Sequence, residues 1–182
     1  MSSRVAARPG RPRSADTDRV ILDAARALLG EHGYHAMTIE AVAARAGVAK
    51  TTVYRRWSTK ADLVVDAVAD TLAPLYRAPA DAEPEQLLGN LVAALSRPES
   101  RAAFLALLAE STADPIVRER AAARLVEPAR ALVQRCAERS GSPVDRDLLF
   151  DVVAGAAIHH VLVLGQPGDQ AFIRGLLELV RG

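Results

Sequence analysis

Residues 38–57 read TIEAVAARAGVAKTTVYRRW, and this stretch decides the fold. From Ile39 onward, apolar residues recur on one face of a short helix, the pattern of a helix that packs on one side only. Gly47 then permits the left-handed backbone that reverses the chain. Val53 and Trp57 lie four residues apart, on the buried side of a second helix. The stretch therefore predicts two short helices joined by a glycine turn.

Polar side chains occupy the other sides of the second predicted helix. They are Lys50, Thr51, Thr52, Tyr54, Arg55 and Arg56. In a helix-turn-helix, the first helix crosses the phosphate backbone and the second enters the major groove of DNA. The pattern thus predicts a DNA-binding helix-turn-helix, and the plainer alternative is an ordinary pair of surface helices.

Two kinds of DNA contact are expected from this segment. Base-edge or groove contacts are assigned to Lys50, Thr51, Thr52 and Arg55, among which arginine is the best reader of guanine. Backbone contacts that set the register are assigned to Thr38, Tyr54 and Lys60. Thr38 is also placed to cap its helix, and Thr59 with Asp62 reads as a capping box for the next one.

The longer stretch TIEAVAARAGVAKTTVYRRWSTKADLV resembles the DNA-binding domain of TetR-type transcriptional regulators. The positions that carry the resemblance are Gly47-Val48, Tyr54, Trp57, Lys60 and Leu63. Ala49 departs from the pattern, because the family commonly has a serine there that caps the recognition helix. Losing such a cap costs on the order of 1 kcal/mol, so the departure weakens the start of the helix.

The resemblance implies an all-α protein of about nine helices. A disordered basic arm would span residues 1–13, a three-helix helix-turn-helix head residues 14–60, and a helical effector-binding and dimerisation body residues 61–182. We expect the first helix to start near Asp16 or Thr17 and end at Gly33. Further expectations are one helix from Thr59 to about Tyr76, a linker at 77–85, a kink at Pro128 and a helix start at Ser142-Pro143.

The distribution of charge agrees with this division. Residues 1–60 contain eleven Lys/Arg and five Asp/Glu, whereas residues 61–182 contain twelve and seventeen. A basic head suits a polyanionic partner, because phosphate neutralisation supplies most sequence-independent affinity. In the arm, Arg11 and Arg13 could enter an adjacent minor groove. The alternative is a mobile tail that touches phosphates loosely.

Composition narrows the class of protein further. The chain has 182 residues, 50% of them hydrophobic and 4% aromatic, which favours a helical protein with a sizeable core. No apolar run reaches membrane-spanning length and no signal-peptide core is present, so we expect a cytoplasmic, nucleoid-associated protein without a membrane partner. Cys136 is the only cysteine, and it reads as a small hydrophobe rather than a redox switch. No phosphate loop, metal-spaced cluster or nucleophile motif points to an enzyme, a metal or a cofactor.

The last two long helices, at residues 143–164 and 170–181, are broadly apolar. In the family that the chain resembles, these helices pair with their symmetry mates as a four-helix bundle, which implies a homodimer. The residues assigned to this interface are Val152, Gly155, Ala156, Val163, Phe172, Ile173, Leu176 and Val180.

The resemblance also implies an effector cavity between Leu63 and Leu164. Candidate lining residues are Phe104, Leu107, Leu108, Ser111, Leu125 and His159, and plain core packing is the alternative for each. Few polar groups converge there, which favours an apolar or amphipathic small molecule without identifying it. The pair His159-His160 could instead make core or interface hydrogen bonds, or serve a metal or catalysis, although neighbouring helical residues diverge by about 100°.

Together these patterns predict a sequence-specific DNA-binding regulator, a repressor that an unidentified small molecule releases from a palindromic operator. Two heads related by a two-fold axis would contact half-sites about 34 to 36 Å apart, or a multiple of that spacing. Two alternatives belong to other classes. One is an architectural or protein-binding helix-turn-helix protein that needs no effector, and the other is a small helical enzyme that uses the histidine pair.

Overall fold

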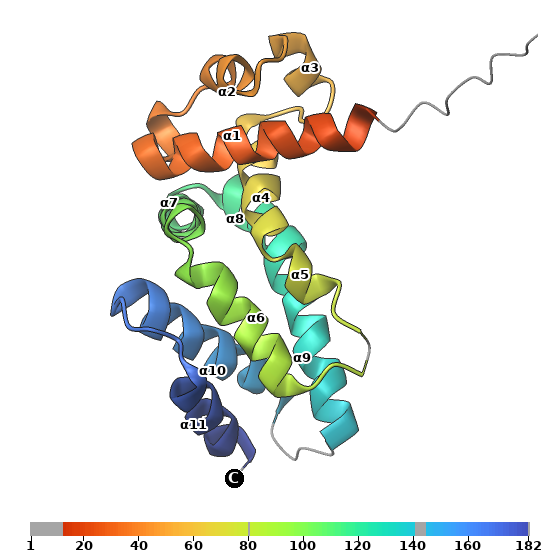
Figure 1. The fold of residues 1–182 in the computed structure, drawn as a ribbon, viewed down its shortest axis with the longest axis vertical. Coiled ribbons are helices and arrows are strands. Elements are labelled where there is room, and N and C mark those ends of the chain that lie inside the picture. The colour runs from red at the N-terminus through yellow and green to blue at the C-terminus, as the bar shows by residue number, and fades with distance from the viewer. Residues whose placement is uncertain (1–12, 80, 141–144, 182) are drawn as a thin grey trace, which may run out of the picture.

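A computed structural model describes residues 13–79, 81–140 and 145–181, and its described part is entirely helical apart from connecting segments. Helices α1 (Arg13–Ala36), α2 (Ile39–Ala46) and α3 (Lys50–Tyr54) form the head, and α4 (Lys60–Thr71) leads from the head into the body. Figure 1 shows α1 lying across one end of the body, with α2 and α3 on its far side.

The body begins where α4 gives way to the short helix α5 (Ala73–Tyr76). It continues through α6 (Pro84–Ser96), α7 (Pro98–Ala113), α8 (Pro115–Ala121), the π-helical turn η1 (Ala122–Val126) and α9 (Glu127–Ser140), then α10 (Arg146–Ile158), the π-helical turn η2 (His159–Val163) and α11 (Gln170–Arg181). Because η1 joins α8 to α9, the described residues form ten continuous helices, against the nine or so expected.

Local signals in the sequence account for most of the helix ends. Thr38 caps α2 by accepting a hydrogen bond from the amide of Ala41 at 3.1 Å. Thr59 and Asp62 form the expected capping box at the start of α4. Asp114 caps α8, whose first residue is Pro115. The predictions for Thr38 and for Thr59 with Asp62 are confirmed, because each cap depends only on residues within one turn.

Two expected boundaries are wrong, and a third lies outside the described residues. Helix α1 starts at Arg13, before the expected Asp16 or Thr17. It is interrupted at Gly33, where its end was expected, because a φ of 75° and ψ of 175° are not helical, and a last turn follows to Ala36. The helix after Thr59 breaks at Leu72 because Pro74, near the start of α5, has no amide hydrogen to continue it. Helix α10 starts at Arg146 under an Asp145 cap, and the expected start at residues 142–143 lies outside the described residues.

The kink expected at Pro128 takes another form. The irregularity is the π-helical turn η1, which ends two residues before Pro128. A proline removes one backbone donor and crowds the preceding turn. A wider turn just before it is one way for a helix to accommodate that change.

The core is continuous from the head into the upper body. Ile21, Val42, Val53, Leu63 and Val117 have no exposed side-chain surface, although they come from five different helices. A second cluster lies lower in the body, where α6 packs against η2 and α11. Across the described residues, no helix combines the length and the apolar character needed to cross a bilayer.

A close approach in the second cluster leads to a test of packing. A Cβ atom added to Gly168 would lie 2.1 Å from Cγ1 of Val92 and 3.1 Å from its Cβ, and Val92 is buried. We expect Gly168→Ala to lower the free energy of unfolding by about 1 to 3 kcal/mol, the usual cost of overpacking. Urea denaturation measures it.

Gly89→Ala is the matched control, because its Cβ would meet only Cδ1 of Ile173, at an ordinary 3.9 Å. Alanine is the better helix former, so this control should gain roughly 0.5 to 1 kcal/mol. Equal stability changes in the two variants would contradict the packing described for Gly168.

Candidate nucleic-acid interface and ligand cavity

The turn between α2 and α3 is set by Gly47. Its φ of 67° and ψ of 32° are left-handed, and the amide of Val48 donates to the carbonyl of Ala43 at 3.0 Å. Ala49 provides no side-chain hydrogen bond to the start of α3. The expected glycine turn and the expected missing cap are both confirmed.

Trp57 anchors α3 to the rest of the protein. Val53 is fully buried and Trp57 is 7% exposed. The indole nitrogen of Trp57 donates to Oδ2 of Asp66 on α4 at 3.0 Å. Helix α3 is only five residues long, and Val53 is its buried residue. The other side chains of α3 are therefore on the sides that do not pack into the head core.

The outer face of α3 contains most of the residues expected to contact DNA. Lys50, Thr51 and Arg55 are exposed, Tyr54 is 46% exposed, and Thr52 is half-buried. Together they form one solvent-facing surface, which we call the α3 surface. Arg11 lies outside the described residues, and Arg13 is the first residue of α1.

Ion pairs distinguish the cations of this region. Lys50 pairs with Glu40 of α2 and lies 5.4 Å from the ring centroid of Tyr54. The hydrogen bond between Lys50 and Glu40 lowers the pKa of the Glu40 carboxyl and raises the pKa of the Lys50 ammonium. Arg56 pairs with Asp18 of α1 and donates to the carbonyl of Thr52 at 3.2 Å. Arg55 makes no side-chain hydrogen bond or ion pair within the described part of the chain, so its guanidinium is available to a partner.

Lys60 has an internal role that the sequence did not indicate. Its ammonium donates to the carbonyls of Tyr34 at 2.8 Å and Met37 at 3.3 Å, and it lies 4.2 Å from the centre of the Tyr34 ring. An ammonium has only three donor hydrogens. Two of these donate to the segment that ends α1, so Lys60 ties α4 to α1. The expected phosphate contact stays a prediction, for which only the third donor is left.

Replacing Lys60 by methionine separates these two roles. We expect Lys60→Met to lower the free energy of unfolding by about 1.5 to 3 kcal/mol, because the carbonyls of Tyr34 and Met37 lose a charged hydrogen-bond donor. The dependence of DNA affinity on salt should stay unchanged. Thermal unfolding and binding titrations at several salt concentrations measure the two quantities.

Lys50→Met is the control, since Lys50 is exposed and lies outside the head core. It should leave unfolding nearly unchanged. If Lys60→Met instead kept full stability and flattened the salt slope by about one unit, the phosphate contact would be correct after all.

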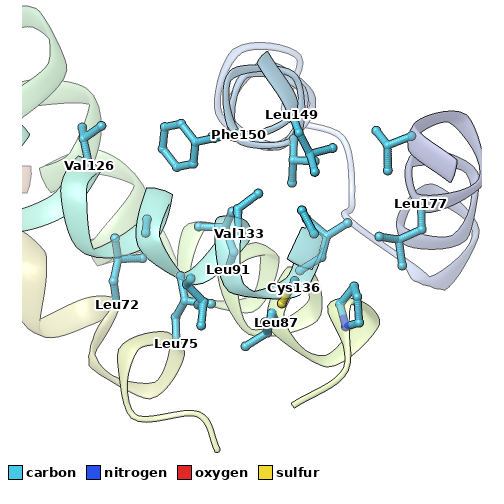
Figure 2. A pocket seen from close by; sticks show the side chains of 18 of the residues that line it. Leu72, Leu75, Leu87, Leu91, Val126, Val133, Cys136, Leu149, Phe150 and Leu177 are labelled. Atoms are coloured by element: carbon cyan, nitrogen blue, oxygen red, sulfur yellow. The ribbon is translucent and has the colours of Figure 1, made fainter. Parts of the chain in front are cut away.

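The body contains an apolar cavity of about 480 Å³ between α6, α9 and α10, which is partly open to solvent. Figure 2 shows leucine side chains from several helices converging on it. The lining residues are Leu72, Leu75, Glu83, Pro84, Leu87, Leu88, Leu91, Phe104, Leu125, Val126, Ala129, Leu132, Val133, Cys136, Ala137, Arg139, Leu149, Phe150, Val153, Ala154, Ile158, Leu177 and Val180. Its volume suits a small organic molecule.

Two of the six expected lining residues, Phe104 and Leu125, lie on this cavity. The other four do not. Leu107 is buried in the core beneath the head, Leu108 is exposed, and the hydroxyl of Ser111 donates to the carbonyl of Leu107. His159 is exposed on the outer side of η2. A sequence signal for the cavity wall does exist, because apolar residues recur at helical spacing from η1 into α9, at Leu125, Ala129, Leu132 and Cys136. Such a stripe does not say whether the helix faces a cavity or a packed core.

The residues expected at a dimer interface are divided between two environments. Ile173 is 3% exposed and Leu176 is buried, and both pack within the same chain against α6, so their assignment to an outer surface is wrong. Val180 lines the cavity, and Phe172 stacks on His160 with ring centroids 4.0 Å apart. Ala156 is half-buried in the same cluster.

Val152, Gly155 and Val163 do face outward. They share an exposed surface with two residues that sequence reasoning missed, Leu148 on α10 and Leu179 on α11. We call these five residues the α10–α11 surface. Large apolar side chains rarely gather in contact with water on a monomeric protein, and an exposed surface of this kind is typical of an interaction site.

Contacts from the α8–α9 region tie the cavity wall to the head. Tyr76 donates to the carbonyl of Leu125 at 3.0 Å, and burial raises the pKa of Tyr76 to about 12. The neighbouring Arg124 pairs with Asp66 at 2.8 Å, and Asp66 also accepts from the indole of Trp57. Four residues earlier, in α8, Arg120 pairs with Asp62 at the start of α4. Asp66 therefore contacts both Trp57, which anchors α3, and Arg124, which precedes the cavity-lining Leu125 in the chain.

A helix-turn-helix head on an all-helical body with a ligand-sized cavity defines a class of DNA-binding regulators. Comparison with known proteins identifies the family within that class. The family model described as bacterial regulatory proteins of the tetR family matches residues 21–67, and the tetracyclin repressor-like C-terminal domain matches residues 79–180. The chain belongs to the TetR family of transcriptional regulators, whose members named here are regulators and not enzymes.

Individual relatives agree along nearly the whole chain. The DNA-binding transcriptional repressor TetR of Mycobacteroides abscessus is 32% identical and covers 93% of this chain and 92% of its own length. An uncharacterised regulator of Bacillus subtilis, YdeS, is 27% identical over 92% and 89%. Among solved structures, a TetR-family member from Streptomyces coelicolor has a TM-score of 0.70, with 22% identity over 92% and 99% of the two chains.

Proposed function

We propose that this protein is a repressor that binds a palindromic operator as a homodimer and is released by a small-molecule effector. The observation that carries the proposal is the link between two sites. A solvent-facing recognition surface on α3 and an apolar cavity in the body are connected through Asp66 and Arg124. An architectural protein that needs no effector would have no use for such a cavity. The cytoplasm, where chromosomal DNA is accessible, is the compartment in which it would act.

The α3 surface supports the DNA-binding part of the proposal. Lys50, Thr51, Thr52 and Arg55 are proposed to reach groove edges, and Thr38 and Tyr54 to contact the phosphate backbone. All six lie in or beside the helix-turn-helix. Lys50 would have to exchange its pairing with Glu40 for a contact with DNA, whereas Arg55 has no ion pair to give up in the described structure.

The α10–α11 surface supports the homodimer. Val163 is 62% exposed and Leu179 is 73% exposed, so a large apolar area faces water in a single chain. A Cβ added to Gly155 or Gly175 would meet nothing within 4 Å of the same chain, which leaves room for a partner helix to approach. A second copy placed by a two-fold axis would cover the same surface on both protomers and would present two heads to two half-sites.

Selection of bound fragments from the source genome tests the proposal directly. The purified protein should enrich fragments that share a two-fold symmetric sequence, and footprinting should show protection of two half-sites. A compound library is then screened for loss of that complex. The absence of any enriched sequence at low ionic strength would refute the repressor, and binding that no compound alters would favour the effector-independent alternative.

Coupling between the two sites can be tested at Arg124. We expect Arg124→Gln to leave effector affinity unchanged but to reduce the effect of effector on operator affinity, because the pairing with Asp66 is lost. Coupling free energies of this kind are about 1 to 3 kcal/mol, or roughly 5-fold to 150-fold in affinity. Operator titrations with and without saturating effector measure the ratio.

Arg118→Gln serves as the control for that experiment. Arg118 is exposed on the same helix and makes no ion pair within the described residues. It should keep the full effector response. A response that survives in Arg124→Gln as well would show that coupling runs through other contacts, and a double variant with Asp66→Asn would show whether the two residues act together.

A further inference from the structure

The helix-turn-helix contains an acidic residue next to its recognition helix. Glu40 is the only Asp or Glu between Thr38 and Thr59, a stretch that contains four Lys and Arg residues. It is exposed on α2, and its carboxylate pairs with Lys50, the first residue of α3. A surface that binds a polyanion gains affinity from cations and loses affinity to anions. A carboxylate at this position therefore lowers the attraction of the α3 surface for DNA.

The pairing removes one cation from the α3 surface. The hydrogen bond stabilises the charged forms of both partners, since it lowers the pKa of Glu40 and raises the pKa of Lys50. To neutralise a phosphate, Lys50 has to leave Glu40, and the carboxylate is then next to the DNA backbone without its cation. Binding through the backbone alone is thus opposed at this point, whether the pair stays together or separates.

Only the bases of DNA can satisfy that carboxylate. A carboxylate accepts hydrogen bonds and donates none, and the phosphate oxygens of the backbone are acceptors too. The donors that face the major groove are the amino groups of cytosine and adenine, and glutamate pairs with the N4 amino group of cytosine. A sequence that places this group beside Glu40 compensates the carboxylate, and other sequences do not. An unpaired charge against the wrong partner is a general source of specificity.

We propose that Glu40 is a specificity-determining residue of the DNA-binding surface. On unrelated DNA, it keeps Lys50 from the phosphates, and the phosphates repel its own charge. On the operator, it accepts a hydrogen bond from the amino group of a cytosine, which leaves Lys50 to donate to a neighbouring base edge. The inference rests on the proposed binding of an operator, but its effect on unrelated DNA can be measured before any operator is known.

Glu40→Gln tests the inference, because glutamine keeps the size of the side chain and removes its charge. Affinity for a duplex of scrambled sequence should rise by about twofold to fivefold per head, the amount that an exposed ion pair contributes. The salt dependence should steepen by about one unit per head as Lys50 becomes free to neutralise a phosphate. Operator affinity should not rise, because the charged hydrogen bond to cytosine is lost. Titrations of the full-length protein on both duplexes at several salt concentrations measure these quantities.

Two outcomes would overturn the inference. An equal rise on both duplexes would make Glu40 a general brake on DNA affinity without any role in specificity. An unchanged affinity for scrambled DNA would show that Glu40 does not compete with phosphates for Lys50. The same substitution made in Lys50→Met protein should leave the salt slope unchanged, since no lysine is then released.

Glu31→Gln is the matched control. Glu31 is exposed on α1 and pairs with Arg45 of α2 through two hydrogen bonds of 2.8 Å. This substitution changes the net charge of the head by the same amount and also frees a cation, but neither residue belongs to the α3 surface. It should leave the ratio of operator to scrambled affinity as in the wild type. A ratio that falls as far as in Glu40→Gln would assign the effect to net charge and refute the role of Glu40.

Failure of this inference can be told apart from failure of the proposed function. If genomic selection with the wild-type protein enriches no sequence, the repressor is refuted and with it any specificity at Glu40. If an operator is found and Glu40→Gln discriminates as well as the wild type, the repressor stands and the role of Glu40 is wrong. Carbon NMR titration of the DNA-free protein verifies the pair itself, because the pKa of Glu40 should rise toward its ordinary value in Lys50→Met.

Discussion

Leu179→Asp is expected to convert the protein into folded monomers that have lost most of their operator affinity. Leu179 is 73% exposed in the single chain, so the substitution leaves the core of the protomer untouched. In the proposed homodimer it would bring two carboxylates into an apolar interface, where unpaired charges are strongly unfavourable. The cost therefore appears in assembly and not in folding.

The loss of operator affinity should be large because two linked heads bind far more tightly than one. Joining two binding modules raises overall affinity by about 10²-fold to 10⁴-fold, and a monomer forfeits that gain. Sedimentation velocity measures the oligomeric state, and gel-shift titrations measure binding. Urea unfolding of the variant should show that each chain still folds.

Ile116→Asp is the matched control. Ile116 is 59% exposed on α8, away from the α10–α11 surface. This variant should remain dimeric and bind the operator normally. If Leu179→Asp stayed dimeric, or if Ile116→Asp became monomeric, the subunits would have to meet at another surface.

Arg55→Gln is expected to weaken operator binding by about 5-fold to 150-fold for each head. A bidentate arginine contact with guanine contributes roughly 1 to 3 kcal/mol of discrimination, and each 1.4 kcal/mol is a tenfold change. Arg55 is exposed beside the turn that ends α3, with its guanidinium unpaired in the described structure. Its loss should also relax the preference for one base pair.

Competition between operator variants measures this effect. The wild-type protein should discriminate at one position of each half-site, and Arg55→Gln should not. Tyr54→Phe provides the contrast, because loss of a phosphate contact should weaken binding by a similar factor on every duplex. Arg55→Gln with unchanged base preference would move Arg55 from the base-reading group to the backbone-contacting group.

The local features of this protein were predictable because each involves neighbouring residues. The caps at Thr38 and Thr59, the left-handed turn at Gly47 and the uncapped start of α3 at Ala49 all depend on atoms within about one helical turn. The head could therefore be recognised from residues 38–57. The break at Leu72 is equally local, since Pro74 signals it. The apolar stripe that continues past Leu72 predicts an unbroken helix instead, and the proline is the stronger of the two signals.

The candidate sites were harder to predict because apolar periodicity does not say what a helix face meets. Ile173 and Leu179 both belong to the apolar surface of α11, yet Ile173 packs against α6 and Leu179 faces water. Leu107 and Leu125 are both buried on helical stripes, but only Leu125 borders the cavity. The position of Lys60 in the sequence predicts a phosphate contact, whereas its hydrogen bonds to two carbonyls of the segment that ends α1 appear only in the structure.

By itself, the sequence determined the helical character, the helix-turn-helix and the family, because those follow from periodicity, caps and motif spacing along the chain. Tertiary structure decided where the cavity lies, which apolar residues stay exposed, and how Asp66 comes to meet both Trp57 and Arg124. The physical reason is that burial and ion pairing depend on which helices share the same space. That is settled by packing among segments tens of residues apart, and no single helix encodes it.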